Sequence, residues 1–255
     1  MPANYAHQRF GRQILKAMPA DARQCIQRFR RMYDMGLHGP DIFFYYNPWW
    51  KTTVGDMGKA FHRQKGQEFF SAACKAASTE AARAYLYGLL AHYCLDSHCH
   101  PLVNQLSGIG EARHSQLESE FDRFLLVQDG ETSPERYDTG KKLKLTRGEC
   151  MTVAEFYPGA EGGHISHCIR SMTFSTRFFT SGNTARRKVL LERIKPGLSD
   201  QMIPAEENEE LSFYVGELKA LYDSAAEAYP RLLAQLTAYM ENGEALDGDF
   251  ERDFG

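Results

Sequence analysis

The chain has 255 residues, a formal net charge of -3 and a sequence pI of about 6.3. This balance excludes a globally basic surface that would attract nucleic acid, and no apolar run approaches the ~18 residues that cross a bilayer. We therefore expect a chain long enough to bury a core, no nucleic-acid partner and at most peripheral membrane contact. The first ten residues lack the charged and apolar segments of a signal peptide, which predicts a cytoplasmic location.

Helical patterns dominate the chain, and no strand pattern of any length is present. Asp21 is a candidate N-cap, Ser78 another, Pro101 a candidate helix stop and Pro230 a candidate kink. The acidic segment 248–255 is expected to be frayed. The predicted helices lie at about 5–18, 21–35, 56–77, 78–99, 108–128, 150–157, 164–179, 184–194 and 209–240. These patterns predict one all-α domain over 1–255, with a mostly polar loop at 129–147.

Histidines and carboxylates recur at helical spacing in the first half of the chain. His92, Asp96 and His100 lie four residues apart, and so do His114 and Glu118. Residues at this spacing share one helix face, and imidazole and carboxylate are ligands that zinc prefers. The alternative is an ion-pair ladder on a helix face. Apolar neighbours mark the first helix as buried, however, and an unpaired buried carboxylate is costly, which favours metal.

The order of these residues resembles that of the zinc-dependent bacterial phospholipases C and, more distantly, that of the fungal single-strand nucleases of the same fold. The resemblance covers roughly residues 2–125. It rests on an N-terminal histidine, a loop aspartate, a histidine on the next helix, HxxxD, a further histidine and HxxxE, which are here His7, Asp41, His62, His92 with Asp96, His100, and His114 with Glu118. It implies a multi-helix bundle whose metal-site helices lie within 2–128, with a helical remainder at 148–242. The family's secreted toxins also carry a C-terminal β-domain, which we do not expect in this chain.

The resemblance also implies a site for two or three zinc ions. Four residues would hold one ion: Asp41, His62, His92 and Asp96. Asp96 would bridge to a second ion, which His7 and the N-terminal residue would also bind. His100, His114 and Glu118 would hold the third. Asp41 would be a candidate general base as well as a ligand.

The N-terminus departs from the family pattern. Family members begin, after processing, with a tryptophan whose amino and carbonyl groups bind zinc. Removal of Met1 would here leave Pro2 as the terminal residue, five residues before His7. Our hypothesis is that this removal completes the metal site, because the secondary amine of proline can still chelate.

Other departures concern the third ion and the substrate pocket. The family's third-ion histidine lies six residues past the bridging aspartate and just after a proline, whereas His100 lies four past Asp96 and just before Pro101. His98 competes for this role but faces another side of the helix, as does Cys99. In choline-specific members an aromatic residue follows the loop aspartate, and Ile42 stands there, which argues against a choline pocket.

Several residues keep two interpretations. Four aromatic residues follow the loop aspartate: Tyr45, Tyr46, Trp49 and Trp50. They could form the wall of a different substrate pocket or a surface that contacts lipid, or they could simply pack the loop onto the core. His38 is a candidate to orient Asp41. His164 and His167 are interpreted as ordinary helix histidines without metal.

Together these features predict a zinc-dependent phosphodiester hydrolase that cleaves a phospholipid head group or another phosphodiester. One alternative is a nuclease or small-molecule phosphodiesterase of the same fold. Another is a non-catalytic protein with structural zinc, which would have four protein ligands and no open position.

Overall fold

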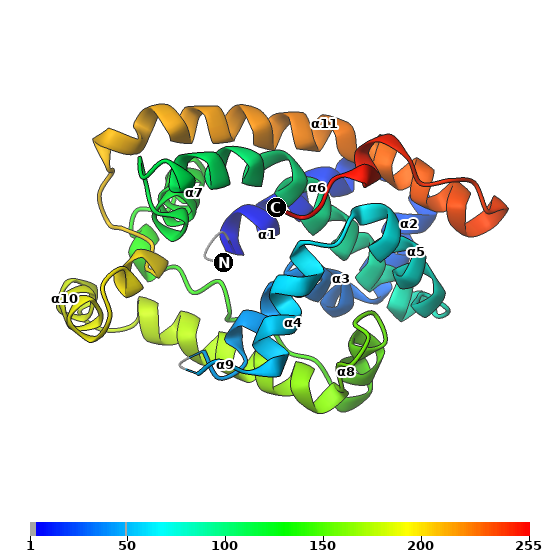
Figure 1. Ribbon diagram of the computed structural model, residues 1–255, viewed down its shortest axis with the longest axis horizontal. Helices are drawn as coiled ribbons and strands as arrows, with labels where there is room; N and C mark the ends of the chain where they lie inside the picture. Colours follow the sequence, from blue (N-terminus) through cyan, green and yellow to red (C-terminus); the bar gives the residue numbers. More distant parts are fainter. Residues whose placement is uncertain (1–3, 49) are drawn as a thin grey trace.

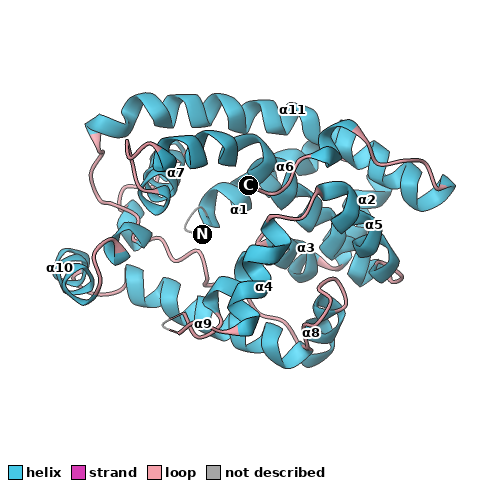
Figure 2. Cartoon of the chain, viewed as in Figure 1, coloured by secondary structure: helices cyan, strands magenta, loops and turns pink. Residues whose placement is uncertain are grey.

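Two long helices, α6 (Glu80–Gly108) and α11 (Ser212–Asn242), pack against each other along the core. Figure 1 shows α11 along one edge of the molecule, α6 and α7 next to it, and α9 along the opposite edge, with α1, α3 and α4 between them. The computed structural model describes residues 4–48 and 50–255, and within these ranges it contains helices and loops but no strand (Figure 2). The all-α prediction is confirmed.

The remaining elements are shorter than these two helices. The other α-helices are α1 (Asn4–Ile14), α2 (Ala20–Arg28), α3 (Arg30–Gly36), α4 (Thr53–His62), α5 (Gly66–Ala76), α7 (His114–Gln128), α8 (Arg147–Ala154), α9 (Gly162–Thr180) and α10 (Thr184–Ile194). The 3-10 turns are η1 (Leu15–Ala17), η2 (Gly39–Tyr45), η3 (Pro134–Arg136), η4 (Leu198–Gln201), η5 (Glu209–Leu211) and η6 (Gly248–Glu251). The segment predicted as a loop at 129–147 holds only η3 before α8 begins.

Helix α6 is the element around which the metal-site residues are arranged. Its middle section is buried on every side, with Leu86, Leu89 and Leu90 fully inaccessible. Helix α3 crosses it closely because Gly36 and Gly88 meet at the crossing. A Cβ on Gly88 would lie 2.2 Å from the carbonyl oxygen of Tyr33, and one on Gly36 would lie 2.3 Å from that of Tyr85. Only glycine therefore permits this packing.

Helix α6 also corrects two predicted boundaries. Thr79, not Ser78, caps its start, because the Thr79 hydroxyl accepts a hydrogen bond from the Ala82 N–H. The helix passes through Pro101, which was predicted to end it, and continues to Gly108. Val103 and Leu106 beyond the proline are buried, and their packing offsets the backbone bond that proline removes.

Other predicted helices are divided or shifted. The predicted helix 21–35 breaks at Phe29 (φ -120, ψ 44), and the helix before it begins at Ala20 with Pro19, not Asp21, at the N-cap. The predicted helix 56–77 divides into α4 and α5, and the helix predicted from 108 begins at His114. No glycine or proline marks the break at Phe29, so local sequence could not indicate it. Helix α11 continues through Pro230.

Segment 248–255 is not frayed, and this prediction was wrong. Phe250 and Phe254 are fully buried, and Phe254 packs edge-on against Phe69 and Tyr93. The Tyr93 hydroxyl donates to the carbonyl oxygens of Asp249 and Arg252 at 2.6 and 3.0 Å. The two aromatic residues outweigh the acidic composition, because each buries a large apolar surface.

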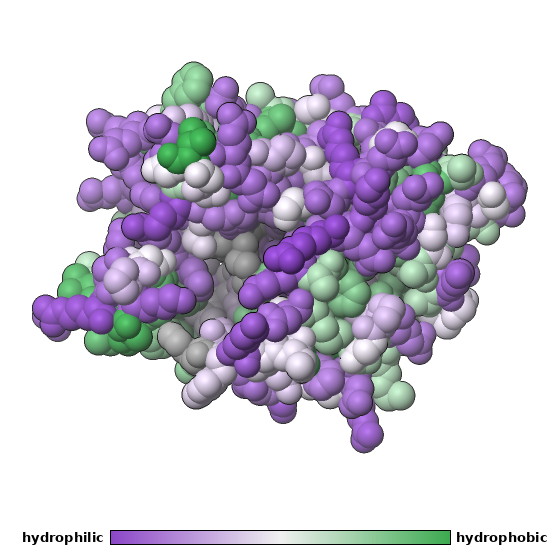
Figure 3. Space-filling model, viewed as in Figure 1, coloured by the Kyte–Doolittle hydropathy of each residue, from purple (hydrophilic) through white to green (hydrophobic). Residues whose placement is uncertain are grey.

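Nothing in the described part of the chain forms a helix both long and apolar enough to cross a membrane. Most of the face in Figure 3 is hydrophilic, with apolar side chains gathered in small areas. All six cysteines are free, and four of them are buried.

Candidate metal centre

The face of α6 that carries His92, Asp96 and His100 is the centre of the site, and we call these three residues the α6 stripe. His92, Asp96 and His100 are all buried and face the same side of the helix. Asp96 lies between the histidines: its Oδ2 is 3.0 Å from His92 Nε2 and 3.7 Å from His100 Nδ1. Its Oδ1 is 3.1 Å from His7 Nε2 on α1. The carboxylate of Asp96 therefore connects residues that belong to separate parts of the site.

Helix α1 brings His7 to this stripe. The ring of His7 stacks on that of His92 with centroids 4.4 Å apart. The start of α1 is fixed from α7, because the Asp122 carboxylate accepts the backbone N–H groups of Tyr5 and Ala6 at 3.0 and 2.8 Å. Its oxygens satisfy two of the N–H groups that have no partner within the helix at a helix N-terminus. Asp122 thus holds the turn that carries His7.

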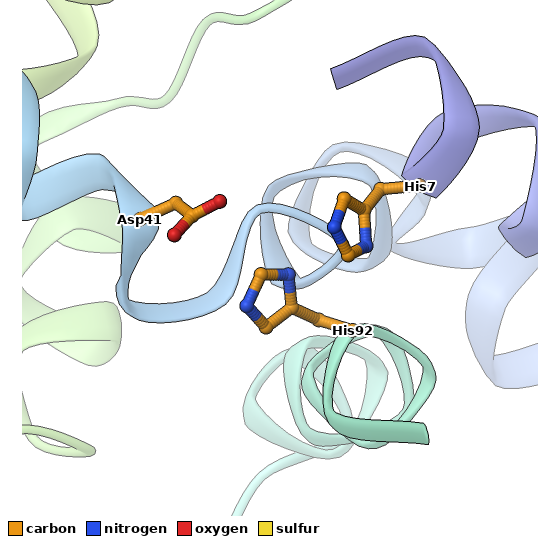
Figure 4. A group of neighbouring side chains, drawn as sticks. All are labelled: His7, Asp41 and His92. Carbon is orange, nitrogen blue, oxygen red and sulfur yellow. The ribbon is translucent and has the colours of Figure 1, made fainter. Parts of the chain in front are cut away.

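The turn η2 and helix α4 supply Asp41 and His62. His62 Nε2 lies 3.0 Å from Asp41 Oδ1. Gly39, with φ +45, begins η2 directly over His92, and a Cβ there would lie 2.3 Å from the imidazole ring. Figure 4 shows the side chains of His7, Asp41 and His92 pointing toward one another from three different elements. The absence of a side chain at Gly39 lets η2 approach the ring.

Helix α7 supplies the last two residues. His114 Nε2 lies 3.2 Å from Glu118 Oε1, and His100 Nε2 lies 3.4 Å from the same oxygen. Glu118 is buried, whereas the His114 side chain is 36% exposed. This part of the site therefore reaches solvent at His114.

Three histidines of the site have a fixed tautomer. Each places Nδ1 against a backbone carbonyl oxygen: His62 on Gly58 at 2.7 Å, His92 on Leu37 at 3.2 Å and His100 on Phe254 at 2.7 Å. A carbonyl only accepts, so each Nδ1 must carry hydrogen and donate. In the neutral ring, Nε2 then keeps its lone pair. Metal-binding histidines are typically oriented in this way.

Eight of the predicted ligands lie within the described residues, and their possible metal-binding atoms form three groups. Within each group these atoms lie within 4.8 Å of one another. These groups are His7, Asp41 and His92; His62, His92 and Asp96; and His100, His114 and Glu118. Three buried atoms of these residues also lack a hydrogen-bond partner: His7 Nδ1, His92 Nε2 and Asp96 Oδ2. Buried polar atoms without partners are rare, and a bound cation would satisfy lone pairs left in this way. The residues present therefore fit zinc.

Charge balance supports the same conclusion. Burial alone would raise the pKa of Asp96 and of Glu118, but nearby positive charge holds both well below their ordinary values. The histidines supply this charge at Asp96, and His100 and His114 contribute to it at Glu118. Burial alone would lower the pKa of His100, yet Asp96 and Glu118 raise it to about 9. Buried ionised carboxylates need nearby positive charge. Without metal, a proton on His100 would supply part of that charge, and a divalent cation would displace this proton.

Other predicted residues take different places. Pro2 and Trp49 lie outside the described residues. Tyr45 is buried, and its hydroxyl accepts from the Asn4 side chain at 3.2 Å. Tyr46 is half-buried against the rings of His164 and His167, and Trp50 is 71% exposed.

The histidines and the cysteine outside the three groups serve local structure. His38 is buried, and its Nε2 lies 3.4 Å from the Gln8 side-chain nitrogen. Burial lowers the pKa of His38 to about 3, so it is neutral at ordinary pH. His98 contacts the Cys94 carbonyl within its own helix. The buried Cys99 belongs to none of the three groups, and burial raises the pKa of its thiol, which disfavours the thiolate that binds zinc.

Sequence reasoning missed Asp122 and the carbonyl of Phe254. Asp122 follows Glu118 by four residues, so the helical spacing that identified His114 and Glu118 was a signal for it. A backbone carbonyl has no signature in the sequence. Phe254 was assigned to a frayed tail, and only the tertiary structure places its carbonyl on His100.

A family model described as zinc dependent phospholipase C matches residues 6–168, which is well over half of the chain. The matched range contains the described residues of all three donor groups. Neither the curated proteins nor the solved structures contain a match.

Proposed function

Because the chain belongs to the zinc-dependent phospholipase C family, we propose that it hydrolyses phosphodiester bonds and that its substrate is a phospholipid, from which it releases the phosphorylated head group. One observation carries this proposal. The Nε2 atoms of His62, His92 and His100, each with its Nδ1 on a backbone carbonyl, are directed at buried carboxylates of the same centre. Three oriented imidazoles and shared carboxylates are the donor set of a centre with more than one zinc ion.

The proposed centre holds two or three ions. His100, His114 and Glu118 would bind one of them. The remaining residues would bind a neighbouring pair: His7, Asp41, His62, His92 and Asp96. Asp96 is suited to bridge the pair, because its two oxygens face His7 on one side and His92 on the other. Pro2, freed by removal of Met1, remains the candidate for a further ligand beside His7.

Zinc in such a centre supplies a Lewis acid for a phosphoryl group and lowers the pKa of water. The residues of the chain then have separate tasks. Asp41 lies beside His62 and close to His7 and His92, so it can accept a proton at its carboxylate as well as bind metal. His114 is the exposed member of its group, and we propose that the substrate phosphate enters on this side.

The first experiment is zinc content per chain by elemental mass spectrometry, on protein of verified N-terminus purified without chelators. It is followed by hydrolysis assays on phospholipids with different head groups, on bis(p-nitrophenyl) phosphate and on single-stranded DNA. Two or three zinc ions with phospholipid hydrolysis support the proposal. One tightly held ion without hydrolysis supports a structural zinc, and hydrolysis of DNA alone supports the nuclease alternative.

Asp41→Asn tests the role of the loop carboxylate. Loss of a general acid-base group typically costs roughly 100-fold or more in rate, so turnover should fall by this factor while most zinc is retained. His98→Gln is the matched control, because His98 lies on the same helix as His92, Asp96 and His100 but places its Nδ1 2.7 Å from the Cys94 carbonyl oxygen of that helix. Equal activity of wild-type protein and Asp41→Asn would overturn the assignment.

A further inference from the structure

Helix α9 and the loop after η2 form an exposed apolar groove away from the donor groups. Trp50 and Phe174 line it and are 71% and 72% exposed. Phe178 lies one helical turn beyond Phe174 and stacks on it with ring centroids 6.3 Å apart. Large apolar side chains that share one exposed surface mark an interaction site more often than scattered ones do.

The next helix extends this exposed apolar surface. Helix α10 has only one buried residue, Leu191, whereas Leu190 and Ile194 are 54% and 59% exposed. In Figure 3 apolar side chains gather where Figure 1 places α10. The guanidinium of Arg187 lies over the Phe178 ring at 4.6 Å, which joins α10 to the groove. Most of α10 is exposed.

The charge of this region is opposite to that of the whole chain. Residues 162–194 contain six arginine or lysine residues and one acidic residue, Glu192, in a chain of net charge -3. Glu192 accepts hydrogen bonds from the Gly197 N–H and the Ser199 hydroxyl, so it is engaged locally. Arg170 and Arg186 are exposed. The surface formed by α9, α10 and Trp50, which we call the α9–α10 surface, is therefore both basic and apolar.

The α9–α10 surface is connected to the metal centre through η2. His167 lines the groove, contacts the Tyr46 ring and lies 3.1 Å from the Asn47 side-chain oxygen. Tyr46 directly follows the turn that carries Asp41. Tyr46 thus links the groove to the turn that carries Asp41.

We propose that the α9–α10 surface binds anionic phospholipid bilayers. Tryptophan, phenylalanine and leucine beside arginine suit the membrane interface, and the excess of basic residues complements anionic head groups. No helix in the described residues can span a bilayer, so the protein would lie on the surface. This inference rests on the proposed function, since it explains how a phospholipid hydrolase meets an aggregated substrate.

Cosedimentation of the full chain with sucrose-loaded vesicles tests the proposal. The vesicles contain either phosphatidylcholine alone or a mixture of it with phosphatidylglycerol. We expect binding to the mixed vesicles, much weaker binding to the neutral ones, and release as the salt concentration rises. Each basic residue near an anionic surface is worth about fivefold in affinity, so Arg170→Glu with Arg186→Glu should weaken binding by at least about 25-fold.

Matched variants distinguish binding through the α9–α10 surface from non-specific binding to vesicles. Phe174→Ser should weaken vesicle binding severalfold, whereas Phe213→Ser should not, because Phe213 is 70% exposed but lies on α11. Arg23→Glu on α2 is the charge control for the arginine variants. Equal binding to neutral and anionic vesicles, or equal loss in test and control variants, would overturn the proposal. So would loss of self-association in Phe174→Ser with vesicle binding unchanged, which would assign the surface to a protein partner.

A soluble substrate distinguishes failure of this inference from failure of the proposed function. Hydrolysis of bis(p-nitrophenyl) phosphate requires no membrane, so the surface variants should hydrolyse it at the wild-type rate. Vesicle binding without any hydrolysis would support membrane binding by the α9–α10 surface and reject the proposed hydrolysis. Hydrolysis of monomeric substrates without vesicle binding would support the proposed hydrolysis and reject membrane binding by this surface.

Discussion

Replacement of Phe254 by alanine tests whether segment 248–255 holds the metal centre in place. The Phe254 ring is fully buried, and its centroid lies 5.9 Å from that of His62 and 6.0 Å from that of His92. Its carbonyl accepts from His100 Nδ1, and its N–H donates to the His62 carbonyl oxygen at 3.0 Å. A single residue thus contacts three of the proposed ligands.

The expected loss of stability follows from this burial. Truncation of a buried phenylalanine to alanine costs about 3–5 kcal/mol, and in a chain of this size each kcal/mol lowers Tm by about 2–4 °C. Phe254→Ala should therefore lower Tm by roughly 10 °C. The variant keeps the carbonyl but loses the ring that anchors it, so the orientation of His100 should relax. Loss of such an orienting contact typically weakens metal binding about 10–100-fold.

Two assays measure these effects: thermal unfolding of zinc-loaded protein, and competition for zinc with a chelator of known affinity. Phe174→Ala is the matched control, because the same ring is removed from a side chain that is 72% exposed. It should change stability by less than about 0.5 kcal/mol. The reasoning is refuted if Phe254→Ala behaves like this control, or if it loses stability without any change in zinc affinity.

Three further predictions concern the centre and its surroundings. Asp96→Asn should lower zinc content by at least one ion per chain, measured by elemental mass spectrometry, because Asp96 contacts His7, His92 and His100; unchanged content would contradict its bridging role. Gly39→Ala should cost at least about 1–2 kcal/mol from its positive φ alone and should also displace the His92 ring, so that both Tm and zinc affinity fall; an unaltered zinc affinity would show that the ring does not need this space. His38 is held neutral by burial with a pKa of about 3, below the value near 6.5 of the unfolded chain. The unfolded state therefore binds more protons between these values, and stability falls as the pH decreases, by roughly 1 kcal/mol per pH unit. In zinc-free protein, the free energy of unfolding measured with urea should depend less on pH between pH 6 and 4 in His38→Gln than in the wild type. The same pH dependence in both proteins would contradict the assignment.

The sets of candidate ligands that share one helix face could be predicted because helical spacing is a local property. Four residues make slightly more than one turn, so His92, Asp96 and His100 must share a face wherever the helix lies. The same holds for His114 and Glu118. The all-α class followed in the same way from periodicity along the chain. The order of these residues also sufficed to indicate the family that the comparison then identified.

The ends and breaks of helices were less predictable. Pro101 was expected to end α6, and no signal indicated the break at Phe29. In both places packing at a distance decides the backbone conformation. Val103 and Leu106 gain enough burial to carry α6 past its proline.

Only the tertiary structure decided how the separate candidate ligands meet. His7, Asp41 and His62 lie on three elements, and nothing local to any of them specifies a distance to Asp96. The orientation of the imidazoles depends on backbone carbonyls at Leu37, Gly58 and Phe254. Every residue has such a carbonyl. The side chains in the sequence could therefore indicate the candidate ligands, while only the path of the backbone determines which nitrogen each histidine presents.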